Sequence, residues 1–420
     1  MHAADPVRRR WEFGSRVGGL VQRGAPMTHP YLTLVRTPGV PVRLGAVFVS
    51  AVTLGMMSLT VVLCVREWTG SFALAGVASG LFSLGNAAGI ALQGRLLDRA
   101  GGGAVVGVAG AVCASAILVF VVAGSAGAPS GVLLVSVVVA GGTVPAVTAA
   151  VRSWLPSALV SEHDRTASYA LLSVAFQAAI AVGPLLVSVC VVVAGPALGG
   201  LVAAVLVGVA AGMYVRAARS DHPASLRGRL AGPGDVLTRG LRVVLAVTAM
   251  TGVGFGAVVV ALPAVMTDRG TPALSGVLFA AIAVGEVCGA LAYGSWRWRG
   301  RRPLHLVLGL VGSGGAYATA VVAVPSTVVL VVVLFVSGMA AGPVAIVLSA
   351  LIDDVTRRGV VGRAYALLVS TNLVAIAGGS AAAGFMADLM APALLLGVPA
   401  GLSGIAAGWT LACRQSLLRG

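Results

Sequence analysis

The sequence contains no lysine, and charged residues of either sign are scarce. All 28 basic residues are arginine, and charged residues together make up 10% of the chain, against about 25% in soluble domains. Hydrophobic residues make up 58% of the chain, and its mean hydropathy is +1.00. Because so few charges cannot cover a surface that faces water, the composition favours a membrane protein with many spans.

Residues that carry catalysis or bind metals are also few and scattered. The five cysteines stand alone in or at the end of apolar runs, without a Cys-x-x-Cys pair, and the five histidines fall in tails, loops or helix ends. We therefore expect buried apolar cysteines, no metal, no cofactor and no enzyme. The net charge of +15 comes from arginines in short loops without interleaved aromatic residues, so no nucleic-acid partner is expected.

Apolar runs long enough to cross a bilayer repeat along the chain from residue 44. A spanning helix needs about 20 apolar residues, and in lipid only a helix or a closed barrel satisfies its own backbone. These runs are too long and too continuously apolar for barrel strands. The sequence predicts an all-α fold with twelve spanning helices, at about 44–65, 72–94, 104–124, 131–151, 167–193, 197–215, 242–266, 273–294, 303–324, 326–350, 364–387 and 393–413.

The arginines fall almost entirely on one side of these predicted spans. Of the 28, 26 lie in the N-terminal tail, in the even-numbered connections or after the last span, and only Arg66 and Arg269 lie on the other side. Because cytoplasmic loops are rich in Arg, we expect both termini in the cytoplasm. The predicted organisation is a tail (1–43), a six-helix bundle (44–219), a linker (220–240), a second bundle (241–414) and a tail (415–420). Met27 is an alternative start, with residues 1–26 disordered or not translated.

The two halves resemble one another in sequence. With an offset of 200 residues, Gly85, Gly89 and Gly94 match Gly285, Gly289 and Gly294, and near an offset of 196 the run Tyr169–Leu172 matches Tyr365–Leu368 and Gly183 matches Gly379. Such matches predict two pseudo-symmetric bundles related by an axis along the membrane normal.

Between the second and third runs stands a charged segment that reads as a turn, Gly94-Arg95-Leu96-Leu97-Asp98-Arg99-Ala100-Gly101. Twelve helices, two related halves, a basic central loop and this Gly-x-x-x-Asp-Arg-x-Gly segment together resemble the major facilitator superfamily. The resemblance covers residues 44–414. It implies a conformational gate on the cytoplasmic side, in which Asp98 contacts the start of the eleventh helix near Arg363 and the basic Arg152. Such a contact is favourable because a helix N-terminus carries about half a positive charge. The proposed gate residues are Gly94, Asp98, Arg99, Gly101, Arg152 and Arg363.

Departures from the family pattern accompany this resemblance. The second copy, Gly294–Gly300, has no acid, and Gly183-Pro184 in the fifth helix lacks the full antiporter motif. Glycines beside Pro145 and Pro343, in the fourth and tenth helices, allow close packing and bending. We assign the helix hinges to Pro145, Gly183, Pro184 and Pro343.

Glu286, in the eighth predicted helix, is the most informative residue inside the membrane. A charged carboxylate at a helix centre costs about 2.5–3.5 kcal/mol. Either it exchanges a proton or attracts a cationic substrate, or it is a structural hydrogen bonder. Its repeat-related partner is Asn86, a neutral amide. The proton or substrate candidates are Glu286, Asn86, Gln177, Asn372, Thr53 and Thr251, although most buried hydroxyls are expected to bond back to their own helix.

Taken together, these residues predict a secondary active transporter that works by alternating access. A cavity with one acid, apolar walls and no embedded arginine suits a hydrophobic or cationic small molecule, and proton-coupled efflux, as an antiporter driven by the proton gradient, is the predicted activity. Uptake or proton-independent permeation and a non-transporting receptor are the alternatives. The expected partners are the substrate and the lipid bilayer. We expect a monomer, and the Ala/Gly/Val/Arg bias favours a bacterial plasma membrane.

Overall fold

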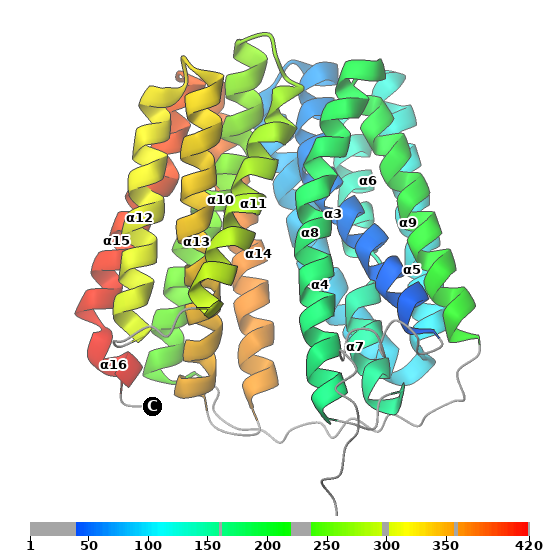
Figure 1. The fold of residues 1–420 in the computed structure, drawn as a ribbon. Coiled ribbons are helices and arrows are strands. Elements are labelled where there is room, and N and C mark those ends of the chain that lie inside the picture. The colour runs from blue at the N-terminus through cyan, green and yellow to red at the C-terminus, as the bar shows by residue number, and fades with distance from the viewer. Residues whose placement is uncertain (1–38, 159–161, 220–236, 296–301, 357–359, 419–420) are drawn as a thin grey trace, which may run out of the picture.

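The structure is a computed structural model that describes residues 39–158, 162–219, 237–295, 302–356 and 360–418 (Figure 1). Within these ranges the chain forms helices and no strand. Twelve helical segments are long and apolar enough to cross a membrane, and each coincides with one of the expected runs. The predicted all-α fold with twelve spans is therefore confirmed. The expected tail 1–43 and linker 220–240 fall mostly outside the described residues.

The N-terminal half forms seven helices because the fourth span is divided in two. They are α3 (Val40–Thr69), α4 (Phe72–Ala100), α5 (Gly102–Ser125), α6 (Ser130–Gly142), α7 (Val147–Ala158), α8 (Glu162–Ala194) and α9 (Pro196–Ala218). The C-terminal half contains α10 (Arg239–Asp268), α11 (Leu274–Ser295), α12 (Arg302–Ala323), α13 (Thr327–Val355), α14 (Val361–Ala387), the 3₁₀ helix η1 (Pro392–Leu396), α15 (Gly397–Ala412) and α16 (Arg414–Leu418).

The charged segment Gly94–Ala100 is helical, which corrects its reading as a turn. It forms the last two turns of α4, and the chain reverses only at Gly101. Gly101 has φ 80°, a left-handed conformation that glycine adopts without a steric cost, and α5 begins at the next residue. The charges therefore lie on a helix end and not on a flexible loop.

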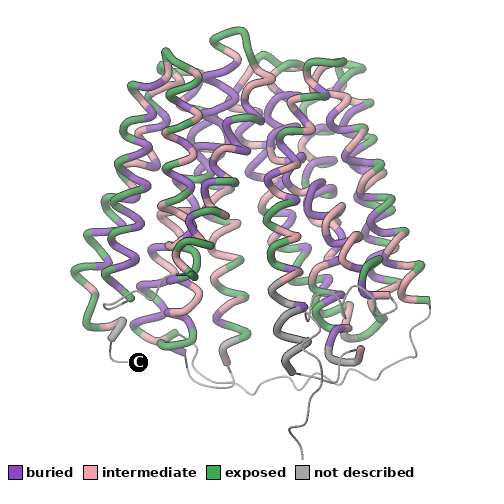
Figure 2. Tube along the Cα trace, in the orientation of Figure 1, coloured by how far each residue is buried: buried purple, intermediate pink, exposed green. Residues whose placement is uncertain are grey.

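The outer surface of the molecule is apolar, as a bilayer requires. Large hydrophobic residues lie open along the outside of the helices, among them Val192 and Val322, each 76% exposed. Figure 2 shows that buried residues concentrate where helices face one another. Buried side chains are mostly small, so these helices associate by close packing of their backbones.

The internal repeat predicted from the glycines is confirmed by their contacts. In the first half a Cβ on Gly55 of α3 would lie 2.7 Å from the Ile180 carbonyl oxygen of α8. In the second half Gly256 of α10 faces the Ile376 carbonyl oxygen of α14 in the same way. The reverse contacts are Gly183 against Val52 and Gly379 against Val253. Each half thus packs its first helix on its fifth through the same pair of glycines.

The two bundles touch through α4 with α14 and through α8 with α11. We call one end of the molecule the basic end, because most of the described arginines lie there: Arg95, Arg99, Arg152, Arg216, Arg242, Arg302, Arg363 and Arg414. The other end, with Arg66 and Arg269, is the opposite end. In Figure 1, α8 and α14 diverge toward the basic end. The close backbone approaches between the bundles lie toward the opposite end; a Cβ on Gly80, for example, would lie only 2.7 Å from the Ala377 carbonyl oxygen.

Candidate gates and transport site

At the opposite end an acid from one bundle holds the start of a helix from the other. Asp388 follows α14, and its carboxylate accepts hydrogen bonds from the Ser71 hydroxyl (2.9 Å) and from the backbone N–H groups of Phe72 (3.0 Å) and Ala73 (2.9 Å). These N–H groups are the first of α4, which have no partner within their own helix. The carboxylate therefore closes this end by joining α14 to α4.

The environment of Asp388 favours its ionised form. Burial raises the pKa of its carboxyl, but the hydrogen bonds from Ala73, Phe72 and Ser71 and the charge of Arg66 lower it, and the net pKa lies below the usual value. The Arg66 guanidinium also stacks over the Phe72 ring at 4.5 Å. The positive end of the α4 dipole adds to this stabilisation of a negative charge. Nothing in the sequence analysis singled out Asp388, although an acid directly after an apolar run was a visible signal.

The second contact between the bundles, α8 with α11, is uncharged. The Ser188 hydroxyl of α8 donates to the Ala273 carbonyl oxygen just before α11. Gly276 of α11 packs directly on the backbone carbonyl of Pro184. No ion pair between α8 and α11 occurs among the described residues.

The residues predicted to form a gate lie at the basic end. Gly94 and Arg99 are exposed on the last turns of α4, Arg152 is exposed on α7, and Arg363 is exposed in the first turn of α14. A side chain on Gly94 or Gly101 would meet no atom within 4 Å. The side chain of Asp98 lies outside what the structure describes, so its contacts with Arg152 and Arg363 stay a prediction.

The fourth span is broken at Pro145, and a glutamine from α4 closes the break. Because proline has no N–H, the helical ladder fails between α6 and α7. The Gln93 side-chain amide donates to the Val144 carbonyl oxygen (2.8 Å) and, weakly, to that of Gly142 (3.5 Å), while its oxygen accepts from the Ala146 N–H (2.9 Å). Gln93 is 4% exposed. Sequence reasoning missed it, although it continues the four-residue spacing of Gly85 and Gly89.

The other assigned hinges lie within continuous helices. Pro184 is inside α8 and Pro343 is inside α13, and neither interrupts its helix. Gly183 is a packing contact, since a Cβ there would lie 2.6 Å from the Val52 carbonyl oxygen. Among the four assigned hinges, only Pro145 therefore stands at a break in the described helices.

Glu286 is half-buried on α11, where that helix meets α13 through interlocking glycines. A Cβ on Gly342 of α13 would approach the Glu286 carbonyl, and one on Gly338 would lie 2.9 Å from the Glu286 nitrogen. Tyr317 of α12 lies within electrostatic range of the carboxyl group and beside Ser337 of α13. Glu286 thus shares the interior of the C-terminal bundle with two hydroxyl groups from neighbouring helices.

Asn86 occupies the corresponding place in the N-terminal bundle. It is 6% exposed on α4, next to Gly85, whose Cβ would lie 2.5 Å from the Val138 carbonyl of α6. Gly285 makes the corresponding contact with α13 beside Glu286. The structure therefore places the acid and the amide at equivalent positions of the two halves, as the offset of 200 residues predicts.

The four remaining candidates lie on four different helices, α3, α10, α8 and α14. The hydroxyls of Thr53 and Thr251 donate to carbonyls one turn back in their own helices, Val49 (3.2 Å) and Val247 (3.1 Å). Gln177 is exposed on α8. Asn372 is half-buried on α14, with its Oδ1 3.1 Å from where a Gly252 Cβ would lie. Within the described residues, these four side chains do not gather with Glu286 in one cluster.

Arg43, which the sequence analysis placed in the N-terminal tail, is buried in a helix at the basic end. Arg43 is in the first turns of α3 and only 2% exposed. Its guanidinium lies 3.7 Å from the centre of the Trp154 ring of α7, and one NH2 group donates to the Ala217 carbonyl oxygen of α9 at 3.0 Å. A cation over an indole face and a carbonyl at a helix C-terminus are both favourable partners. Arg43 therefore ties three helices of the N-terminal bundle together.

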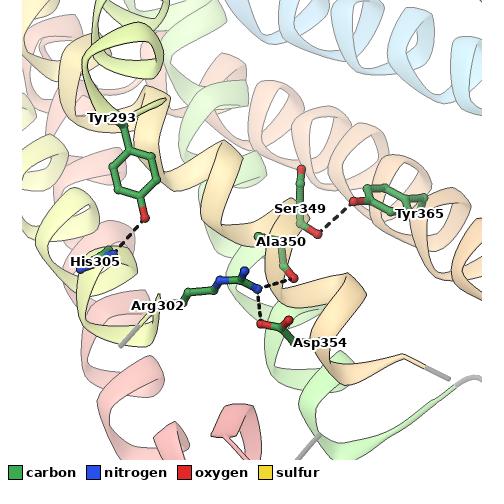
Figure 3. A network of polar contacts seen from close by, with 7 residues as sticks. All are labelled: Tyr293, Arg302, His305, Ser349, Ala350, Asp354 and Tyr365. Carbon is green, nitrogen blue, oxygen red and sulfur yellow. Dashed lines mark hydrogen bonds and ion pairs between the residues drawn. The ribbon is translucent and has the colours of Figure 1, made fainter. Parts of the chain in front are cut away.

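Polar contacts also join helices of the C-terminal bundle at the basic end (Figure 3). Arg302 of α12 pairs with Asp354 of α13, and the Tyr293 hydroxyl of α11 lies 2.9 Å from Nδ1 of His305 on α12. The Tyr365 hydroxyl of α14 donates to the Ser349 carbonyl oxygen of α13 at 3.0 Å. The ion pair is half-exposed and contributes little by itself, but the set links four helices. Among the described residues no group of His, Cys, Asp and Glu is arranged to hold a metal ion.

Comparison with known proteins agrees with this arrangement of helices. Residues 244–417 match the sequence pattern of the Major Facilitator Superfamily. The matched segment lies in the C-terminal bundle, whose sequence is therefore similar to that of the major facilitator superfamily. No curated protein sequence matches the chain significantly.

Solved structures of three transporters share the fold at low sequence identity. One is a bacterial homologue of the human lysosomal transporter Spinster, in an inward-facing and unoccupied conformation. It is 12% identical with a TM-score of 0.72, and the match covers 94% of this chain and 99% of that protein. The peptide transporter POT bound to sulfate is 14% identical (TM-score 0.71; 92% and 98% covered), and the D323A mutant of the nucleoside transporter NupG is 12% identical (0.69; 90% and 98%). At such identities the likeness shows the fold alone.

Proposed function

We propose that this chain moves a small molecule across a membrane by alternating access, as a secondary active transporter. The observation that carries the proposal is the contact between the two pseudo-symmetric bundles, whose closest approaches lie toward one end. Rocking the bundles about this contact would open one end as the other closes, as is general for transporters built from repeated halves. The proteins that share the fold are transporters, which supports the same class of activity.

We further propose that transport is proton-coupled efflux of a hydrophobic or cationic compound, with Glu286 as the residue that exchanges the proton or attracts the cation. Glu286 is an acid inside an apolar bundle, with Tyr317 and Ser337 nearby. Ionisable residues within spanning helices are costly and usually functional. The neutral Asn86 at the equivalent place supports a role for the charge beyond packing. The proton gradient would then supply the energy.

The coupling is tested in proteoliposomes that contain the purified full-length chain. Radiolabelled tetraphenylphosphonium serves as the hydrophobic cation and an imposed pH gradient as the driving force. We expect uphill accumulation that stops when nigericin collapses the gradient. Accumulation that is unaffected by nigericin would reject proton coupling, and flux that follows only the concentration gradient would favour a proton-independent permease.

Substitution of Glu286 tests the site separately from the activity. Glu286→Gln keeps the size of the side chain and should remove the pH dependence of transport at unchanged protein abundance. Asp268→Asn is the matched control, because Asp268 is an exposed acid at the end of α10, on a different helix from Glu286. If Glu286→Gln transports like the wild type at every pH, the assignment of Glu286 is wrong. A receptor without transport would show binding but no flux for any compound.

A further inference from the structure

Three hydrogen bonds to Asp388 join two parts of the chain that are more than 300 residues apart and belong to different bundles. The donors are the Ser71 hydroxyl and the N–H groups of Phe72 and Ala73, all between 2.9 and 3.0 Å from the carboxylate. Ser71 is also the N-cap of α4, where its hydroxyl accepts from the Leu74 N–H at 3.2 Å. The start of α4 therefore obtains one of its caps from its own bundle and the others from α14.

Such a contact between the bundles cannot persist through a transport cycle. If the two halves rock, as the proposed function requires, the start of α4 must move away from the end of α14. Arg66 of α3 acts on the charge of Asp388 from the same bundle as α4, and a Cβ on Gly384 of α14 would lie 2.5 Å from the Phe72 carbonyl oxygen. Opening this end would expose the N–H groups of Phe72 and Ala73 and release the carboxylate.

We propose that Asp388 is a positioning residue of the transport cycle, a latch that holds the opposite end closed by capping the start of α4. This inference rests on the proposed alternating access but not on the identity of the substrate. The latch is one-sided. The α8–α11 contact between the bundles, in which the Ser188 hydroxyl donates to the Ala273 carbonyl, is neutral. Charge-assisted hydrogen bonds are about twice as strong as neutral ones, so the α4–α14 contact sets the balance between closed and open states at this end.

The latch would act as the counterpart of the predicted gate at the basic end. The α4 and α14 helices run in opposite directions, so the last turns of each lie near the first turns of the other. Asp98 stands in the last turn of α4, and Asp388 follows the last turn of α14. Asp388 caps the partner helix at the opposite end, as Asp98 is predicted to do at the basic end. The inference nevertheless stands on the Asp388 contacts alone.

The test measures the state of the protein directly. Spin labels are attached at Ser130→Cys, at the start of α6, and at Val328→Cys, near the start of α13. Both positions are exposed at the opposite end and lie in different bundles, so the distance between the labels reports the opening of this end. The exposed Cys288 and the partly exposed Cys413 are replaced by alanine. Electron–electron resonance distances are then recorded without substrate for the wild type, Asp388→Asn and Asp388→Ala.

We expect the ratio of long to short distances to rise about tenfold in Asp388→Ala and by less in Asp388→Asn, because loss of a cap and of its charge interaction shifts an equilibrium by roughly this factor. Ser71→Ala should shift the ratio in the same direction. Asp268→Asn, an exposed acid at the same end without a bond to α4 among the described residues, should leave it unchanged.

Two outcomes would overturn the latch: an unchanged distance distribution in both Asp388 variants, or an equal shift in Asp268→Asn. A merely structural role for Asp388 would lower the melting temperature without changing the ratio of the two distances, and this also counts against the latch. Because the measurement needs no substrate, its result is separate from that of the flux assays. A shifted ratio in a chain that transports nothing would contradict the proposed function and leave the latch standing.

Discussion

Replacing Gln93 should loosen the broken fourth span without altering any residue of α6 or α7. In the wild type the Gln93 amide supplies one acceptor to the Ala146 N–H and one donor to the Val144 carbonyl, at 2.9 and 2.8 Å. Gln93→Met keeps the length of the side chain and removes both. Gln93→Glu at a pH where the acid is ionised keeps the acceptor and loses the donor.

The size of the effect follows from these two bonds. A buried backbone group that loses its partner costs about 1–3 kcal/mol, whereas hydrogen bonds between helices in a bilayer average about 0.6 kcal/mol. The 3.5 Å contact with Gly142 is too long to add much. The methionine variant should therefore be destabilised by about 1–3 kcal/mol overall, with the loss concentrated at the break.

Hydrogen exchange of the detergent-solubilised protein, read by mass spectrometry over residues 143–150, measures this locally. A loss of about 2 kcal/mol corresponds to roughly thirtyfold faster opening. Gln93→Met should show this acceleration, and Gln93→Glu should lie between it and the wild type. Gln177→Met is the control, because Gln177 is an exposed amide on α8. Wild-type exchange in Gln93→Met would refute the role assigned to the glutamine.

Three further predictions can be tested with the same protein. Gly289→Leu should abolish stable expression, because a Cβ there already collides with the Met339 carbonyl of α13, and detergent-resistant folding by gel filtration checks this. Asp98→Asn should slow turnover in flux assays while the melting temperature stays at the wild-type value. The pKa of Asp388 is lowered, so its contribution to closure is complete above the usual Asp pKa of about 4 and is lost only as pH falls through the lowered value; the spin-label distances should therefore be constant from about pH 8 to 5.

The helices and their pairing could be predicted because they depend on patterns that recur along the chain. Apolar runs have the length of a bilayer span, and two of the glycine pairs that match at an offset of 200 residues, Gly85 with Gly285 and Gly89 with Gly289, pack α4 on α6 and α11 on α13. Glu286 was found because an acid within an apolar spanning run is costly, and Asn86 was found as its partner in the repeat. For these residues, local sequence and position in the repeat carried enough information.

Gln93, Asp388 and Arg43 could not be placed from sequence patterns, for a physical reason that they share. Each satisfies backbone groups of a distant segment: the break after Gly142, the start of α4 and the end of α9. Where unsatisfied groups arise depends on how helices end and on which end of the molecule is closed. The residues next to Gln93, Asp388 or Arg43 in the sequence determine neither how a distant helix ends nor which end of the molecule is closed.

The glycine contact between the bundles has a consequence for variation in this protein. Gly76 of α4 and Gly384 of α14 face one another so closely that the Cα of one lies 2.8 Å from where a Cβ on the other would be. When α4 and α14 separate, no side chain at these two positions has to change its rotamer. Even an alanine at either position would act as a wedge, driving the opposite end apart in proportion to its size. Natural substitutions at these two sites should appear together with compensating losses of bulk, or in chains that rest with this end open.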